Sequence, residues 1–185
     1  TISGWINTSN TGAVKMIASK DDDTNRNFHL SINASNYLSG GVFSSGTGYF
    51  TTGDVNICDG AWHHVAFTFV ASTSVNVYVD GELDATNTSS IPATIDNDTV
   101  NFLIGRLGDG SYDFNGKIDE VAVWNTALSA SDIAKIASKP LNLSLASAYD
   151  TDRTSNLKLW LRAGDKGEPE KNPSITRSDY YSDFD

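Results

Sequence analysis

Apolar and polar residues alternate along most of the chain, and this period of two is the pattern of half-buried β-strands. The alternation is clearest in Trp62–Val70 and Ser74–Val79, which are joined by the short stretch 71–73. We expect these two segments to form a hairpin. In the second strand, the three valines should lie on one face of the sheet and Tyr78 on the other.

Shorter alternating segments predict further strands, separated by polar turns that often contain glycine. They are residues 1–6, 14–17, 28–32, 41–43, 55–57, 100–104, 114–124 and Leu157–Leu161. In the segment 114–124, the period of two predicts one shared face for four residues: Ile118, Glu120, Ala122 and Trp124. The polar stretch from Asp84 to Thr99 is predicted to be a loop.

One short helix is predicted near residues 130–137. Ser129 is a good N-cap residue, Asp132 stands three positions later, and Ile133 and Ile136 begin a short apolar stripe. Pro140 then ends the helix, because proline cannot continue the hydrogen-bond ladder.

Many short strands and a single late helix favour an all-β antiparallel sandwich or jelly roll over an α/β fold. The 185 residues suffice for one such domain and are few for two. We expect residues 1–163 to form the sandwich and the polar residues 164–185 to form a C-terminal tail or edge segment. Because the alternation begins at the first residues, we also expect the chain to be part of a longer polypeptide that supplies the first strand.

Charge and composition narrow the classes of partner. The net charge of −10 argues against nucleic acid, because a phosphate backbone is bound by clustered Lys and Arg. No run approaches the roughly 18 apolar residues of a membrane helix, so we expect no membrane insertion. Cys58 is the single cysteine, and its strand-like surroundings predict a small buried hydrophobic residue.

Two stretches carry a specific resemblance to a known family. The first is D-G-A-W-H-H-V-A at 59–66 with V-Y-V-D-G at 77–81, and the second is F-N-G-K-I-D-E-V-A-V-W-N-T-A-L-S at 114–129. They resemble, in the same order, the central hairpin and the closing strand and helix of laminin-G-like and pentraxin-like domains. The resemblance implies the jelly roll of the concanavalin A-like lectin/glucanase superfamily. Domains of this kind are also found in structural proteins of marine phages.

The aromatic and imidazole residues of these motifs have structural interpretations. We expect Trp62 and Trp124 to be buried, because indole rings supply large contact areas between strands. His63 and His64 follow one another in a strand and therefore point to opposite faces. We expect them to serve packing and hydrogen bonding rather than a shared metal site or base.

We predict a non-catalytic domain. Asp119 and Glu120 could be taken for an acid–base pair, but consecutive strand residues point apart, which glycoside hydrolysis does not allow. A turn-anchoring or strand-end hydrogen-bonding role is expected for them instead. The fold implied by the resemblance also occurs in bacterial glucanases, which use a Glu-x-Asp-x-x-Glu-like cluster on one strand, and none of the four Glu residues here has that spacing. We therefore name no catalytic residue.

The resemblance to pentraxin-like domains implies a calcium site at one edge of the sandwich. Acidic residues occur at both matching places, in the loop 21–25 and in the loop 108–113. Calcium prefers carboxylate and carbonyl oxygens on flexible loops. The candidate ligands are Asp22, Asp23, Asp109 and Asp113, and the alternative is that these acidic loops are simply solvated.

Two functions remain open from the sequence. The first is a surface binding module for glycan or protein ligands, assisted by calcium, within a larger extracellular or virion protein. Its candidate ligand-binding aromatic residues are Tyr37, Tyr49 and Tyr112, which could equally pack in the core or at its rim. The second is a structural decoration or appendage domain that contacts other subunits of a virion or surface assembly. A binder predicts exposed aromatic residues among polar loops, whereas a structural part predicts apolar patches.

Overall fold

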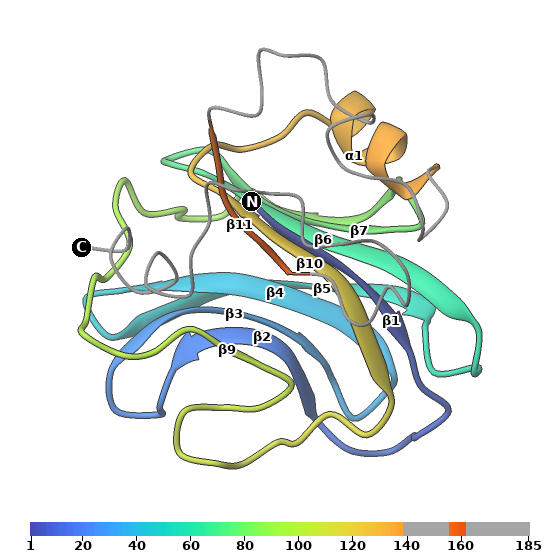
Figure 1. The fold of residues 1–185 in the computed structure, drawn as a ribbon. Coiled ribbons are helices and arrows are strands. Elements are labelled where there is room, and N and C mark those ends of the chain that lie inside the picture. The colour runs from blue at the N-terminus through green and yellow to red at the C-terminus, as the bar shows by residue number, and fades with distance from the viewer. Residues whose placement is uncertain (139–155, 162–185) are drawn as a thin grey trace, which may run out of the picture.

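The computed structural model describes residues 1–138 and 156–161, which form two stacked antiparallel β-sheets (Figure 1). The six-stranded sheet has the order β11-β10-β1-β6-β7-β8, and the five-stranded sheet has the order β5-β4-β3-β2-β9. The first sheet contains β1 (Ile2–Asn7), β6 (Trp62–Val70), β7 (Ser74–Val79), β8 (Glu82–Asn87), β10 (Lys117–Trp124) and β11 (Leu157–Leu161). The second contains β2 (Lys15–Asp21), β3 (Arg26–Ile32), β4 (Tyr37–Ser44), β5 (Thr47–Asn56) and β9 (Leu103–Ile104). This architecture confirms the predicted all-β sandwich of the jelly-roll type.

The core lies between the two sheets and is built from alternate residues of their strands. The three valines of β7 face this core, whereas Tyr78 lies on the opposite face of the strand, as the sequence predicts. The sheets approach closely at Gly40 of β4, where a Cβ atom would lie 2.7 Å from Cβ of Phe67 on the other sheet. Any side chain at this position would therefore push the sheets apart.

Helix α1 (Ala130–Ala137) packs on the outer face of the six-stranded sheet (Figure 1). Ser129 and Asp132 form a capping box, in which each side chain accepts a hydrogen bond from the backbone N–H of the other. Ile133 and Ile136 pack against this face, which confirms the predicted helix and its bounds. In the described part of the chain, the outer face of the five-stranded sheet has no helix over it.

Strand bounds were the weakest sequence predictions. β4 and β5 are longer than the predicted segments 41–43 and 55–57, and β9 is shorter than 100–104. The sequence pattern does not predict β8, because it places most of the residues of this strand in the polar loop that begins at Asp84. β8 lies at the edge of its sheet with only half-buried or exposed residues, so it lacks the apolar alternation of an inner strand.

A β-bulge breaks the alternation that the sequence predicts for β10. Glu120 has a φ of +51°, and the pairing between β1 and β10 slips at this point. Ala122 and Trp124 face α1 as predicted, but Ile118 packs against the core between the sheets. The prediction that Ile118 shares their face was therefore wrong, because a bulge adds a residue and reverses the faces that follow it.

The same bulge corrects the argument about the neighbouring carboxylates. Asp119 pairs with Trp5 of β1, and the Trp5 ring contacts His64 on the outer face of the sheet. Glu120 lies on the same outer face, where it accepts a hydrogen bond from the Trp160 indole. The two carboxylates therefore do not point apart. The expected hydrogen-bonding role does fit the contacts, since Asp119 Oδ1 accepts the Glu120 N–H at 2.7 Å.

The predicted buried residues of the motifs have different environments. Trp124 and Cys58 are buried, as expected, but Trp62 is only half-buried at the start of β6. Within residues 1–138 and 156–161, no helix has the length and apolar character needed to cross a membrane.

Candidate functional site

The outer face of the five-stranded sheet carries a compact group of aromatic and charged side chains. Leu30 and Ile32 of β3 are fully buried in the core, so His29, which alternates with them, points to the outer face. Phe43 follows the inward-facing Val42 in β4 and lies on the outer face for the same reason. We call the group formed by Asp21, Arg26, His29, Phe43 and Phe50 the outer-face cluster.

Three rings form the centre of this cluster. The His29 ring stacks on Phe50, with centroids 4.6 Å apart and an angle of 25° between the planes. Phe43 meets both rings edge to face, at 5.9 Å from His29 and 5.1 Å from Phe50. Phe43 is buried, whereas His29 and Phe50 are half-buried, so these two rings form the accessible layer.

A glycine makes room for the Phe50 ring. Gly41 lies opposite Phe50 across the β4–β5 pair, and a Cβ atom there would lie 2.5 Å from Phe50 Cδ1. The ring therefore lies over the bare backbone of β4, which holds it flat beside His29. Any larger residue at Gly41 would displace it.

Asp21 anchors the polar half of the cluster. Its carboxylate is fully buried, with Oδ2 at 3.1 Å from His29 Nδ1 and Oδ1 at 3.3 Å from Arg26 Nε. Oδ1 also accepts the backbone N–H of Asp23 at 2.8 Å. Burial alone would raise the pKa of Asp21, but the hydrogen bonds from His29 and Asp23 and the charge of Arg26 outweigh burial and lower it. Asp21 is thus a permanent negative charge beneath the surface.

Arg26 covers the buried ring of Phe43. Its Cζ atom lies 4.4 Å from the ring centroid, a cation–π arrangement. One terminal nitrogen lies 3.1 Å from Asp23 Oδ1, and about a third of the side chain is exposed (35%). Because Arg26 and Phe50 both contact Phe43, a guanidinium group and an aromatic ring lie on the same surface.

The structure brings together the two loops predicted to bind calcium. The N–H of Gly108 donates to the Asp21 carbonyl at 2.7 Å, and a Cβ on Gly108 would lie 2.7 Å from Asp22 Cβ. Asp22 Oδ1 accepts the N–H groups of Thr24 and Asn25, and these turn hydrogen bonds, chiefly those from Asn25, lower the pKa of Asp22.

The other predicted ligands also have partners within their own loops. Asp109 Oδ1 accepts both the hydroxyl and the N–H of Ser111, which lower its pKa. Asp23 pairs with Arg26, and Asp113 Oδ1 lies 3.8 Å from Arg106 Nε. Among residues 1–138 and 156–161, no group of three or more His, Cys, Asp or Glu side chains is placed to hold a metal ion. Calcium binding stays a prediction.

The three tyrosines predicted to bind ligand lie apart. Tyr49 faces inward and packs against the core, opposite Val42. Tyr37 is half-buried at the far end of β4 from Phe43, and Tyr112 is exposed in the loop before β10. The aromatic rings that contact one another on the outer face are instead His29, Phe43 and Phe50. The alternation of β4 and β5 contains this signal, since each phenylalanine follows an inward-facing residue, but the strands were predicted too short to show it.

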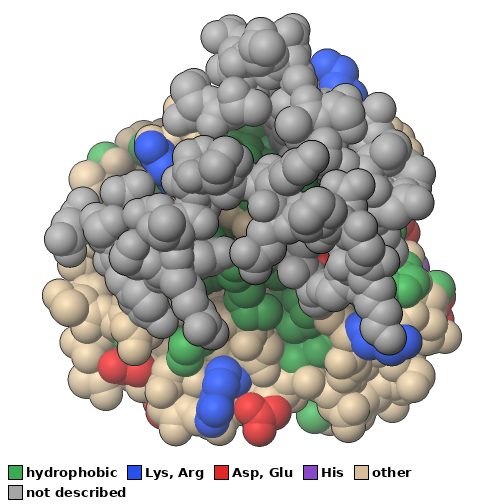
Figure 2. All heavy atoms as spheres, in the orientation of Figure 1, with side chains coloured by type: hydrophobic (Ala, Val, Ile, Leu, Met, Phe, Trp, Pro, Cys, Tyr) green, Lys and Arg blue, Asp and Glu red, His purple; other side chains and the backbone are tan. Residues whose placement is uncertain are grey.

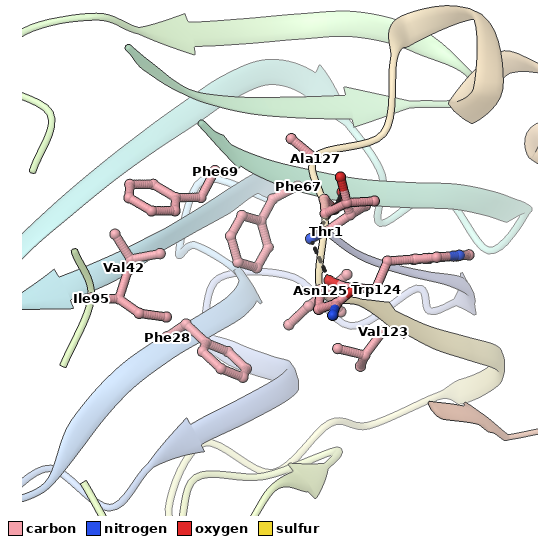
Figure 3. A pocket seen from close by; sticks show the side chains of 12 residues that line it. Thr1, Phe28, Val42, Phe67, Phe69, Ile95, Val123, Trp124, Asn125 and Ala127 are labelled. Carbon is pink, nitrogen blue, oxygen red and sulfur yellow. Dashed lines mark hydrogen bonds between the residues drawn. The ribbon is translucent and has the colours of Figure 1, made fainter. Parts of the chain in front are cut away.

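A pocket separate from the outer-face cluster lies between the two sheets. Apolar side chains come to the surface near the centre of the view in Figure 2. There a pocket of about 200 Å³ is lined by Phe28 and Val42 from one sheet and by Phe67, Phe69 and Val123 from the other (Figure 3). Most of the lining is apolar, and its polar residues are Thr1, Asn125 and Thr126; the amino group and hydroxyl of Thr1 already donate to backbone carbonyls of Trp124 and Thr126. The pocket therefore offers a polar ligand few hydrogen-bonding groups, none of them a charged side chain.

The two adjacent histidines have separate environments, as the sequence predicts. His63 bridges two carboxylates, with Nδ1 at 2.8 Å from Asp80 and Nε2 at 3.1 Å from Asp59. Burial alone would lower the pKa of His63, but these two partners raise it. His64 is fully buried on the other face against Trp5, and burial lowers its pKa to about 4. They form no shared site.

Comparison with known proteins places this architecture in a family. A laminin-G-type family model, described as the concanavalin A-like lectin/glucanases superfamily, matches residues 1–134. The human adhesion G-protein coupled receptor D1 is 33% identical over 75 residues, which are 40% of this chain and 9% of the receptor. The chain thus corresponds to a small part of that relative.

Several solved structures share the fold of this chain. A candidate carbohydrate-binding protein of Bacteroides ovatus has a TM-score of 0.63 and 22% identity, with 87% of this chain and 44% of that chain covered. The carbohydrate-binding module CBM40 of the Ruminococcus gnavus IT-sialidase, bound to α2,3-sialyllactose, has a TM-score of 0.61 and 18% identity, with 74% and 81% covered. Because the family model spans most of the chain, the chain belongs to the concanavalin A-like lectin/glucanase superfamily.

Proposed function

We propose that this chain is a non-catalytic glycan-binding module, and that the outer-face cluster is its binding surface. The observation that carries the proposal is the buried Phe43 ring, which contacts both the Arg26 guanidinium, at 4.4 Å, and the Phe50 ring, at 5.1 Å between centroids. Sugars present apolar C–H faces and polar hydroxyl edges, so a ring next to a hydrogen-bond donor matches both. The likeness to carbohydrate-binding modules supports the same function.

The outer-face cluster fits a glycan better than the apolar pocket does. A sugar placed in that pocket would bury most of its hydroxyl groups against apolar side chains, and hydroxyl groups that lose water without a new partner cost free energy. On the outer face, Arg26 and His29 supply polar groups that are already fixed by Asp21. Because these side chains are already ordered, they lose less conformational entropy when a ligand binds.

An extracellular setting is part of the proposal. The similar proteins include an adhesion receptor and a carbohydrate-binding module bound to α2,3-sialyllactose, which supports this setting. The structural-appendage alternative predicts a contiguous apolar surface. The apolar side chains around the pocket between the sheets are the described surface that such a contact would use.

A glycan microarray, followed by calorimetry with the best ligand, tests the proposal. Phe50→Ala should weaken binding about ten-fold, because it removes the stacking surface. Tyr37→Ala is the matched control, since Tyr37 is also a half-buried aromatic residue of this sheet but lies at the far end of β4. A chemical unfolding curve for each variant shows that the protein is folded.

Two results would count against this function. If no saccharide on the array binds, the glycan-binding function fails and the appendage function becomes the better account. If a glycan binds but Phe50→Ala and Tyr37→Ala have equal affinities, the module binds sugars through another surface.

A further inference from the structure

The charges around the outer-face cluster are unequal. Five carboxylates lie in the two adjoining loops and at the end of β2, and two guanidinium groups lie among them. The carboxylates are those of Asp21, Asp22, Asp23, Asp109 and Asp113, and the cations are Arg26 and Arg106. Hydrogen bonding lowers the pKa of three of these acids, so they stay ionised at neutral pH. The field at the cluster is therefore negative.

Arg26 does not offset this field for an incoming anion. Its Nε is held by the buried Asp21 and one terminal nitrogen by Asp23, while its plane rests on Phe43. These contacts use two of its five N–H groups, and a ligand carboxylate that pairs with the others would lie next to the charges of Asp21 and Asp23, which repel it. The remaining N–H groups can still donate single hydrogen bonds to uncharged oxygen atoms.

His29 adds an acceptor rather than a donor. Its Nδ1 faces the ionised Asp21 carboxylate at 3.1 Å, and this contact requires the proton to reside on Nδ1. In the neutral imidazole, Nε2 then carries a lone pair. Nδ1 is the one ring nitrogen with a partner in the described part of the chain. A hydroxyl group can donate to Nε2, whereas an ionised carboxylate has no proton to donate.

We propose that the outer-face cluster selects uncharged sugar units over sugars that carry a carboxylate, such as sialic or uronic acids. Arg26 donates to a sugar oxygen, His29 Nε2 accepts a hydroxyl proton, and Phe50 stacks on the sugar ring. Like charges that face each other across an interface disfavour binding, so Asp23 and its neighbours reject the acidic sugar. This inference rests on the proposed glycan-binding function.

The test compares matched pairs of immobilised glycans that differ by one acidic unit, with the full chain and with EDTA present. The pairs are lactose with α2,3-sialyllactose, and an oligogalactoside with an oligogalacturonide of equal length. Where a pair shows binding, we expect the dissociation constant of the uncharged member to be at least about ten-fold lower than that of the acidic member. The preference should shrink as the salt concentration rises, because salt screens exposed charges.

Asp23→Asn provides the decisive variant, because Asp23 is the exposed partner of Arg26 (64%) and its removal should leave the fold intact. We expect it to raise the affinity for the acidic member several-fold and to leave the uncharged member unchanged. Glu82→Gln on the other sheet removes an equal charge at a distant exposed site and should change neither.

Each outcome has a separate meaning. If no glycan in any format binds, the glycan-binding function itself fails. If the acidic member binds as tightly as the uncharged one, or if Asp23→Asn and Glu82→Gln behave alike, the charge selection is wrong while glycan binding stands.

Discussion

Asp21 and His29 form a carboxylate–imidazole pair beneath the outer face of the five-stranded sheet, with Oδ2 at 3.1 Å from Nδ1. They come from neighbouring strands, and the Asp21 side chain is fully buried while the His29 ring reaches the surface. The buried partner therefore fixes the orientation and the tautomer of the accessible one. The same carboxylate holds Arg26, so one residue organises the polar side of the cluster.

Removing the charge of Asp21 should loosen the whole cluster. We expect Asp21→Asn to lower the free energy of unfolding by about 1–3 kcal/mol, because it breaks charge-assisted hydrogen bonds at a buried position. Urea unfolding at pH 7 measures this change. Asp23→Asn is the control and should change stability by less than about 0.5 kcal/mol, because Asp23 is exposed. Equal effects of the two variants would contradict the anchoring role of Asp21.

His64 should make the protein less stable in mild acid. Burial lowers its pKa in the folded state to about 4 from an ordinary 6.5, and neither ring nitrogen has a partner among the described residues. The unfolded chain therefore takes up the proton more readily. The contribution of the neutral His64 ring to the free energy of unfolding is fully present above pH 6.5. It falls as the pH drops from 6.5 toward 4, by about 3 kcal/mol in total.

His64→Phe tests this assignment, because phenylalanine keeps the ring contact with Trp5 and cannot be protonated. Urea unfolding between pH 4 and 7 should show a flatter dependence of stability on pH for the variant. Acid-sensitive carboxylates such as Asp21 lose their contribution below their ordinary pKa of 3.8, outside this window. Parallel curves for the two proteins would rule out His64 as the source.

His63 should have the opposite dependence. Asp80 and Asp59 raise its pKa above 6.5, so the folded state holds the proton more tightly than the unfolded state. This stabilisation is fully present below pH 6.5 and is lost as the pH rises through the raised pKa. His63→Gln should therefore cost about 1 kcal/mol at pH 5.5 and less at pH 8.5, measured by urea unfolding. A cost that is the same at both values would show that His63 acts only through uncharged hydrogen bonds.

Sequence patterns predicted the elements with long, regular alternation and missed those whose structure depends on neighbours. The structure confirms the predicted bounds of three elements, Trp62–Val70, Ser74–Val79 and the helix Ala130–Ala137. The spacing of apolar residues within each of these segments is enough to define it. The bulge at Glu120 depends on pairing with β1, which no local pattern records.

The candidate site shows the same limit. The acidic loops were visible in the sequence, and their proximity followed from the family resemblance. The outer-face cluster was not found, because it combines residues of β2, β3, β4 and β5 that meet only through strand order and register. Asp21 in particular was passed over in favour of Asp22 and Asp23, since a run of three acids does not show which of them is buried.

Calcium removal tests the remaining sequence prediction. If the loops bind calcium as predicted, a concentration about 100 times the dissociation constant stabilises the folded state by about 2.7 kcal/mol. The melting midpoint should then be a few degrees higher in calcium than in EDTA. Asp22 and Asp109 would have to exchange their turn hydrogen bonds for the ion, so the double variant Asp22→Asn and Asp109→Asn should abolish the rise. Glu82→Gln should retain it. Identical melts in calcium and EDTA would remove calcium from the account of this protein, and the charge selection would then operate without a metal ion.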